Sequence, residues 1–411
     1  MPILLEEDLQ RPLPRMYRVR QQFDETRLED VAGTVRAELA KPEIRALVKP
    51  GMRIAVGVGS RGIQNLYTIV ETTVNSLKEL GAEPFIVSAM GSHGGGTEEG
   101  QREVLAGYGI TEERLGVPVV TTVDTVYLGN CANGRPVWFD RAAYEADLIV
   151  PINRVKLHTD FVGPIQSGLC KMLVIGLGNH KGCSAVHEEA PEVFAGAIEE
   201  TARLILQKAP VGFGIAILEN AYDKTYAVEA VPAEHLDERE KELVQIAKGN
   251  MPYIMLDEAD VIVCGAIGKD ISGAGFDPNI LGRSSVLKQF VLHIPRYQRL
   301  VLCDVTPASH GNGIGVGLFD VITKKVAEQL DLESMYANAI ACNCLGDASV
   351  PCTVDDEETA IRVALKCCRN IDRDHPRIIR IQNTLHLGEI EVSEALLDAV
   401  RADSRMSLIE N

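Results

Sequence analysis

Short apolar runs alternate along the chain with stretches in which apolar residues recur every three or four positions. The first pattern predicts buried strands, and the second predicts helices that bury one face. In the first half of the chain the expected elements are strand 53–58, helix 65–80, strand 84–90, helix 97–108 and strand 147–155. Because strands and helices alternate, we predict an α/β fold built on a mostly parallel sheet.

A second series of the same kind begins near residue 259. Its expected elements are strands 261–266, 300–305 and 377–382 with helices 320–330 and 357–369. We therefore predict two α/β domains with mostly parallel sheets flanked by helices, residues 1–253 and 254–411, and an active site in the interdomain cleft. Residues 393–402 have apolar positions at helical spacing and could pack back on either domain.

The composition narrows the class of ligand. A formal net charge of −17 over 411 residues disfavours nucleic acid and anionic membranes, so a small molecule is the better expectation. No apolar run approaches the ~20 residues of a membrane span, and the first residues lack a signal-peptide pattern, so we expect a cytoplasmic protein. The ten cysteines include no CxxC pair, which argues against a zinc cluster and a disulfide framework.

A glycine-rich turn, Gly57–Gly62, matches GxGxxG and follows the first predicted strand. A dinucleotide site would also need an acidic residue at the end of the next strand, and the run 84–90 ends in Ser-Ala-Met instead. The turn still offers backbone N–H groups beside Ser60 and Arg61, which suit a phosphate or a carboxylate. An ordinary glycine turn is the alternative.

The next strand leads into a second glycine-rich loop, Gly91–Thr97, which carries His93. We expect Thr97 to cap the following helix and the loop to present His93 at the carboxyl edge of the sheet, where α/β proteins bind ligands. A histidine in that place suits general acid or base catalysis near neutral pH. A solvated loop histidine is the alternative.

Residues 153–189 hold the densest group of candidate side chains, including His158, Lys171 and His187. Apolar and small residues surround Lys171, so its amine could lose its charge and act as a nucleophile or an attachment point, unless it reaches the surface. His187 begins HEEAP rather than HExxH, which excludes the common zinc-protease motif. It could still be one ligand of a metal held otherwise by a cofactor, or an exposed histidine.

These features resemble the lactate racemase family over most of the chain. The resemblance is carried by Ser60-Arg61, Gly91-Ser92-His93, the His158 region, Ser167–Lys171, and His187 sixteen residues after Lys171. It implies an isomerase, a racemase or epimerase of lactate or a related 2-hydroxy acid. Enzymes that make the cofactor would be its partners, with homo-oligomerisation left open.

The resemblance also implies a cofactor and a set of roles. Lys171 matches the lysine that carries the nickel-pincer nucleotide (pyridinium-3-thioamide-5-thiocarboxylic acid mononucleotide), and His187 matches the protein ligand of the nickel. His93 and His158 match the two acid–base histidines of a proton-coupled hydride transfer. Ser60 and Arg61 would contact the cofactor, and Arg61 could also bind the substrate carboxylate.

Two polar loops follow the strands of the second series. Loop 268–279 would form the second domain's wall of the cleft, with Lys269 contacting the substrate anion, although a plain solvated loop fits the sequence as well. Loop 309–315 could line the same cleft or be a surface loop. Two rival functions remain open: a nicotinamide-dependent oxidoreductase that uses the GxGxxG turn, and a non-enzymatic sensor of a small organic anion that uses Arg61 and Lys269.

Overall fold

A computed structural model describes residues 4–59 and 62–410 of the chain. The chain forms two units, a central unit of residues 25–251 and a terminal unit of residues 1–24 with 252–411. The chain passes from the central unit back to the terminal unit after Met251. The first 24 residues, however, were expected in the N-terminal domain and instead belong with the C-terminal part of the chain.

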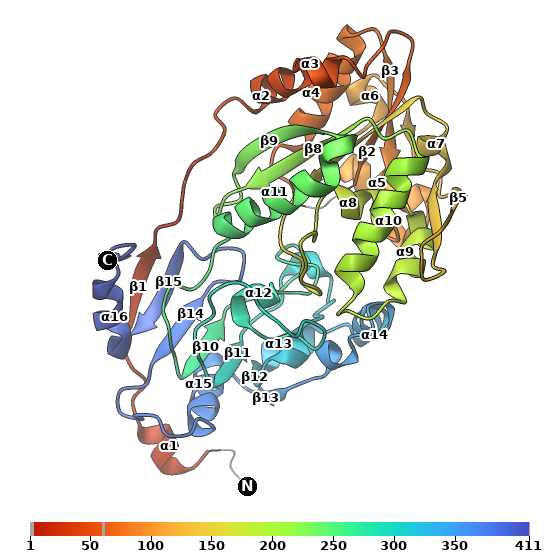
Figure 1. Ribbon diagram of the computed structural model, residues 1–411. Helices are drawn as coiled ribbons and strands as arrows, with labels where there is room; N and C mark the ends of the chain where they lie inside the picture. Colours follow the sequence, from red (N-terminus) through yellow and green to blue (C-terminus); the bar gives the residue numbers. More distant parts are fainter. Residues whose placement is uncertain (1–3, 60–61, 411) are drawn as a thin grey trace. The chain divides into compact units, whose positions relative to one another are not determined.

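The central unit is built on a mostly parallel sheet (Figure 1). Its strands are β2 (Arg53–Val58), β3 (Glu83–Ser88), β4 (Val119–Val120), β7 (Leu148–Arg154), β8 (Phe213–Glu219) and β9 (Thr225–Pro232). They lie in the order β4-β3-β2-β7-β8-β9, and only the β8–β9 pair is antiparallel. A separate hairpin joins β5 (Thr125–Asn130) to β6 (Pro136–Asp140).

The apolar pattern explains these elements. Strands β2, β3 and β7 are buried along nearly their whole length, as strands covered on both faces must be. The helices are α2 (Val31–Leu39), α3 (Pro42–Arg45), α4 (Leu66–Glu79), α5 (Glu98–Gly107), α6 (Glu112–Leu115), α7 (Arg141–Tyr144), α8 (Leu169–Lys171), α9 (Asn179–His187), α10 (Phe194–Lys208) and α11 (Leu236–Asn250). Helix α4 buries Ile69, Val70, Val74 and Leu77 at helical spacing. Thr97 caps α5 as predicted, accepting a hydrogen bond from the backbone N–H of Gly100.

The order of the strands creates a switch point in the central sheet. From β2 the chain continues to β3 and β4 on one side and later returns to β7 on the other side of β2. The connections therefore diverge at the carboxyl ends of β2 and β7. Open α/β sheets bind their ligands at such a place.

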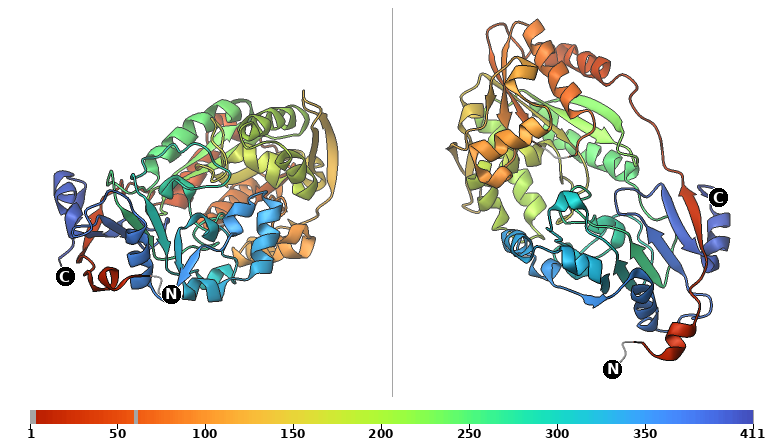
Figure 2. Two further views of the ribbon diagram at one scale, coloured as in Figure 1. Left: turned by 90° about the horizontal axis from the view of Figure 1, so that it is seen from below. Right: turned by 180° about the vertical axis from the view of Figure 1, so that it is seen from behind.

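The terminal unit has its own sheet, in the order β13-β12-β11-β10-β14-β15-β1-β16. Its strands are β1 (Met16–Gln21), β10 (Val261–Cys264), β11 (Arg299–Leu302), β12 (Val321–Thr323), β13 (Cys352–Val354), β14 (Ile378–Ile381), β15 (Glu389–Ser393) and β16 (Met406–Leu408). Strand β1 lies between β15 and β16 and is antiparallel to both, so the two ends of the chain meet in one sheet (Figure 2). Gln21 is fully buried there and bonds to the backbone of Met255 and Leu387.

The sequence pattern predicted three helices of the terminal unit, those within residues 320–330, 357–369 and 393–402. The helices of this unit are α1 (Glu6–Gln10), α12 (Pro278–Leu281), α13 (Lys324–Gln329), α14 (Leu332–Ala341), α15 (Glu357–Lys366) and α16 (Leu397–Ala402). The predicted helix 320–330 was wrong at its start, because residues 321–323 form β12 and pair with β11 and β13. The last helical segment packs in the terminal unit, where Leu396, Leu397 and Val400 join the core.

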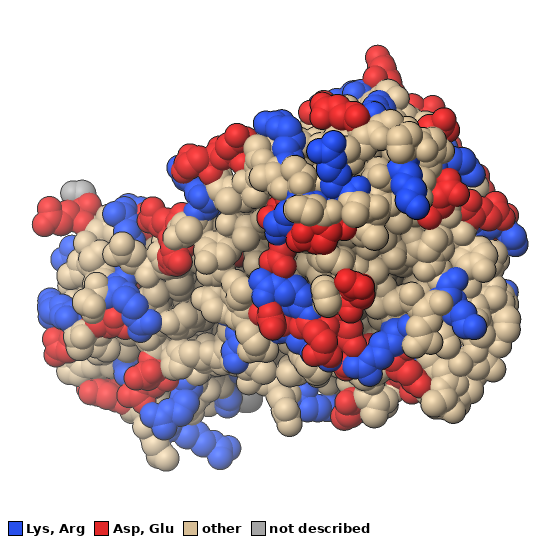
Figure 3. Space-filling model, turned by 45° about the horizontal axis from the view of Figure 1, so that its top comes forward, with Lys and Arg blue, Asp and Glu red and all other residues tan. Residues whose placement is uncertain are grey.

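Acidic and basic side chains are intermixed on the face of the molecule drawn in Figure 3. Ion pairs among the described residues include Arg203 with Asp237 and Arg239 with Glu229. Among the described helices, none combines the length and the apolar character needed to cross a bilayer.

Candidate functional site

Three loops that the sequence singled out follow adjacent strands of the central sheet. The loops after β2, β3 and β7 all leave its carboxyl edge, because these neighbouring strands are parallel. Ser60 and Arg61, the first of the predicted site residues, lie outside the described residues. His93 follows β3, and His158 follows β7.

His158 and Lys171 are in direct contact, with the Nε2 atom of the ring 2.6 Å from the lysine Nζ. Backbone hydrogen bonds between Lys156 and Ser167 fold the intervening loop back on itself and so bring the two residues together. The His158 ring also stacks on Phe161, with centroids 4.2 Å apart. Two residues thirteen positions apart thus form one polar pair in apolar surroundings.

The hydrogen bonds around His158 define the protonation of this pair. The backbone N–H of Asp160 donates to Nδ1 of His158 at 3.0 Å, so Nδ1 carries no proton. A neutral ring then holds its proton on Nε2, which faces Lys171. Because an ammonium group has no lone pair to accept this hydrogen bond, Lys171 must be a neutral amine here.

The electrostatics agree with a neutral pair. Burial lowers the pKa of Lys171, against a smaller opposing effect of Asp160. Burial also brings the pKa of His158 well below its ordinary value, and a positive charge on Lys171 or Lys156 would lower it further. The apolar neighbourhood of Lys171 predicted a pKa shift in this direction, and the contact with His158 adds a specific partner.

Lys171 ends the short helix α8 and leads into a π-helical turn, Met172–Gly176. The loop after β3 packs against this turn. Gly91 has a positive φ of 59°, and a Cβ atom at that position would lie 2.8 Å from the carbonyl oxygen of Ile175. Glycine is therefore required for the close approach of the loop that carries His93.

His187 is the last residue of α9. Its Nδ1 lies 2.8 Å from the backbone carbonyl of Cys183, one turn earlier, and this oxygen can only accept a hydrogen bond. The ring proton is therefore on Nδ1, and the Nε2 lone pair is available to a metal or another donor. In metal-ligating histidines, the ring nitrogen that does not bind the metal typically donates its N–H to a backbone carbonyl or a carboxylate, as Nδ1 does here.

Cys183 extends this group of residues. Its Sγ lies 3.4 Å from Nδ1 of His187 and 4.0 Å from the Oγ of Ser92, the neighbour of His93. Burial raises the pKa of Cys183, but its contact with His187 outweighs this and the pKa is lowered overall. Correspondingly, burial lowers the pKa of His187, and the contacts with Cys183 raise it by more. The loop after β3 thus lies beside the helix that carries His187.

His93 is exposed, and its backbone N–H bonds to the carbonyl of Met90. The structure therefore places His93 in the loop whose Ser92 reaches Cys183. The nearby cations are engaged elsewhere: Arg154 forms an ion pair with Glu219, and Lys181 lies over the ring of Trp138 at 3.4 Å.

Lys269 belongs to the terminal unit, where its ammonium donates to the carbonyl of Gly273 at 2.6 Å and to the side chain of Asn338. Loops 268–279 and 309–315 lie together there, since the Lys269 N–H donates to Ser309 Oγ at 2.8 Å. Both loops follow the carboxyl ends of the parallel strands β10 and β11. The two loops form one polar edge, as expected for strands that pair in parallel.

Sequence reasoning missed Cys183 and Ser92 as parts of the site. Cys183 and His187 are four residues apart, the spacing that places two side chains on one face of a helix, and this spacing was a usable signal for the first. Ser92 could be found only from the packing of its loop on α9. Within the part of the chain that the structure describes, no cluster of three or more His, Cys, Asp or Glu side chains could hold a metal.

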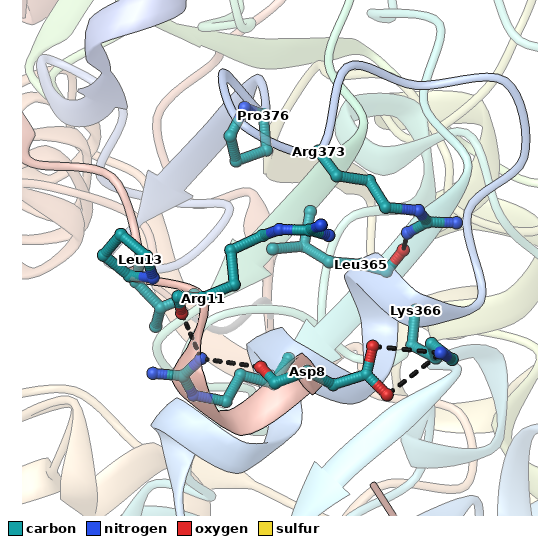
Figure 4. A pocket seen from close by; sticks show the side chains of 9 residues that line it. Asp8, Arg11, Leu13, Leu365, Lys366, Arg373 and Pro376 are labelled. Carbon is teal, nitrogen blue, oxygen red and sulfur yellow. Dashed lines mark hydrogen bonds and ion pairs between the residues drawn. The ribbon is translucent and has the colours of Figure 1, made fainter. Parts of the chain in front are cut away.

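A cavity in the terminal unit, next to α1 and α15, is not a comparable site (Figure 4). Its Lys366 is paired with Asp8, and its Arg373 donates to the backbone carbonyls of Leu365 and Cys368. These contacts tie the start of the chain to α15. The cationic groups of Lys366 and Arg373 are therefore already bonded to other protein groups.

Fold and contacts together define an α/β protein with an amine–imidazole pair at the carboxyl edge of a parallel sheet. Residues 11–195 match the family model of the lactate racemase N-terminal domain. The resemblance to the lactate racemase family is thereby confirmed over these residues. The match supports a racemase or epimerase role, and hence an isomerase.

Solved structures support the same fold. The lactate racemase apoprotein from Thermoanaerobacterium thermosaccharolyticum superposes with a TM-score of 0.52 at 14% identity, over 89% of this chain and 93% of that one. A protein from Thermotoga maritima gives a TM-score of 0.50 at 13% identity, over 80% and 85%. No curated protein matches the chain. The predicted α/β class with mostly parallel sheets is confirmed.

Proposed function

We propose that the protein racemises or epimerises a 2-hydroxy acid, using a nickel-pincer nucleotide attached to Lys171. The observation that carries this proposal is the hydrogen-bonding state of Lys171, since only a neutral amine can form a covalent bond to a carbonyl-type carbon. Lactate is one candidate substrate, and other 2-hydroxy acids, including sugar acids, are equally compatible with the site.

The residues present fit the proposed cofactor. Lys171 would provide the attachment point, and the free Nε2 of His187 would provide one nitrogen ligand for nickel, which imidazole suits. A single protein ligand is enough where the cofactor itself supplies the others. When bound, the nucleotide would supply a hydride acceptor for the α-hydrogen, which is too weakly acidic to leave readily as a proton.

His158 would then exchange a proton with the substrate hydroxyl. In the free protein its Nε2–H is bonded to the lone pair of Lys171. Once the lysine nitrogen is part of a thioamide, that lone pair is delocalised and no longer a good acceptor. Nε2 of His158 would therefore turn to the substrate, with His93 as the second acid–base group.

Substrate binding is assigned to Arg61, and to Lys269 as a second contact. Lys269 would have to exchange its bonds to Gly273 and Asn338 for the carboxylate. The cytoplasmic location, the cofactor-making partner enzymes and any homo-oligomer also remain predictions.

The test is an intact-mass measurement with peptide mapping, on protein co-produced with enzymes that make the pincer nucleotide. We expect a nucleotide-sized addition on Lys171, absent in Lys171→Arg, which keeps a cation but has no comparable nucleophile. Loaded protein should then erase the optical rotation of at least one enantiopure 2-hydroxy acid. An unmodified Lys171, in cells that load a control racemase, would reject the proposal.

A further inference from the structure

Glu240 is a fully buried carboxylate behind the turn that carries Lys171. It lies on α11, has an exposed fraction of 0%, and its Oε2 accepts the backbone N–H of Cys170 at 2.9 Å. Cys170 directly precedes Lys171. No motif in the sequence singles out this glutamate, and the function proposed above does not use it.

Burial of this side chain is unfavourable. Among the described residues no Lys, Arg or His forms an ion pair with Glu240, and its Oε1 has no hydrogen-bond partner. Burial, together with the negative charge of Asp237, raises the pKa of Glu240 to about 7 in spite of the bonds it accepts. A buried carboxylate with one unpaired oxygen destabilises a fold, so an apolar residue of equal length should be tolerated at least as well.

A second buried polar side chain holds the same stretch of backbone. Asn153, at the end of β7, donates from Nδ2 to the carbonyl of Gly168 at 2.7 Å. Gly168 also lies directly against Glu240, because a Cβ atom there would be 2.5 Å from the carboxylate Oε1. Side chains from β7 and α11 thus both contact residues 168–170, which immediately precede Lys171.

We propose that Glu240 is a positioning residue, which fixes the turn 168–170 so that the amine of Lys171 meets Nε2 of His158. The consequence for catalysis rests on the proposed attachment of the cofactor to Lys171. The positioning itself concerns the chain without cofactor and can be measured there.

The experiment is the acetylation of unloaded protein by p-nitrophenyl acetate, followed by mass mapping of Lys171. The amine attacks the ester carbonyl, p-nitrophenolate leaves, and the ammonium proton goes to water. In Glu240→Met, which has the same length but no acceptor, we expect at least tenfold slower acetylation of Lys171 at pH 7. The midpoint of its pH profile should move up towards the ordinary lysine value of about 10.4. The urea midpoint of unfolding should not fall.

Two further variants separate positioning from folding. Glu240→Gln keeps an oxygen acceptor for the Cys170 N–H. In this variant the rate of acetylation of Lys171 should therefore lie within about threefold of the wild-type rate. Asp140→Asn changes another fully buried carboxylate, which caps α7 and accepts a hydrogen bond from Asn179 at the start of α9, so it perturbs the helix of His187 without a contact to residues 168–170. It should leave the acetylation of Lys171 unchanged.

Unchanged acetylation in Glu240→Met would overturn the proposal. So would a Glu240→Met protein that fails to fold, or equal slowing in Asp140→Asn, since either result would make Glu240 a structural residue only. Cofactor loading is scored separately by intact mass. Wild-type protein that never loads would reject the proposed function and leave the positioning result standing.

Discussion

At the scale of single residues, the pair formed by Lys171 and His158 makes a direct prediction. The Nε2–H of His158 stabilises the neutral amine, and burial acts in the same direction. In His158→Phe the pH midpoint for acetylation of Lys171 should therefore rise, yet stay below about 10.4 because burial remains. The measurement is mass mapping from pH 6 to 11. An unchanged midpoint would show that the hydrogen bond does not hold the amine neutral.

Glu240 predicts a pH dependence of stability. Its pKa is about 7 in the folded protein and lies near 4.5 in the unfolded chain, so the folded state binds more protons between these values. Stability from this group is present below pH 4.5 and is lost as the pH rises through 7. The free energy of unfolding of Glu240→Met, relative to that of the wild type, should therefore be larger at pH 8 than at pH 5, by up to about 3 kcal/mol. Urea unfolding at both pH values measures it, and an equal difference at the two would contradict it.

At the scale of elements, the contact of the β3 loop with the π-helical turn depends on one glycine. Gly91→Ala must accept both a positive φ and a clash with Ile175, whereas Gly95→Ala meets the strain alone, because its Cβ would have open space. We expect Gly91→Ala to be less stable than Gly95→Ala by about 1–2 kcal/mol in urea unfolding. It should also lose more activity in the loaded enzyme. Equal stabilities would mean that the loop does not need this close packing.

Three of the six strands in the central sheet, β2, β3 and β7, could be predicted because they are continuous apolar runs, and helices α4 and α5 could be predicted from their regular apolar spacing. Residues 321–323 could not, since three apolar residues before a helix look like its first turn until β11 and β13 are present as partners. Lys171 and His187 could be found from their unusual surroundings in sequence. Glu240 could not, because its link to Cys170 spans seventy residues and exists only after folding.

At the scale of the whole molecule, β1 makes the terminal unit depend on the first residues of the chain. Removing residues 1–21 takes a strand from between β15 and β16 and deprives Met255 and Leu387 of Gln21. Hydrogen exchange should show lost protection in 389–393 and 406–408 but not in 53–58. Removing only residues 1–10 keeps β1 and should preserve the hydrogen-exchange protection of all three segments. Retained protection in the longer deletion would contradict the role of β1.

The position of β1 also affects how the protein is made. Strand β1 leaves the ribosome long before its partners β15 and β16, which are synthesised hundreds of residues later. At 5–20 residues per second, it waits roughly 20–70 s with its backbone unpaired. A waiting strand can pair with other chains, and charged side chains reduce that risk. Arg18 and Arg20 alternate with the buried Val19 and Gln21. The charges of these two arginines should therefore reduce the pairing of the nascent strand with other chains until β15 and β16 are synthesised.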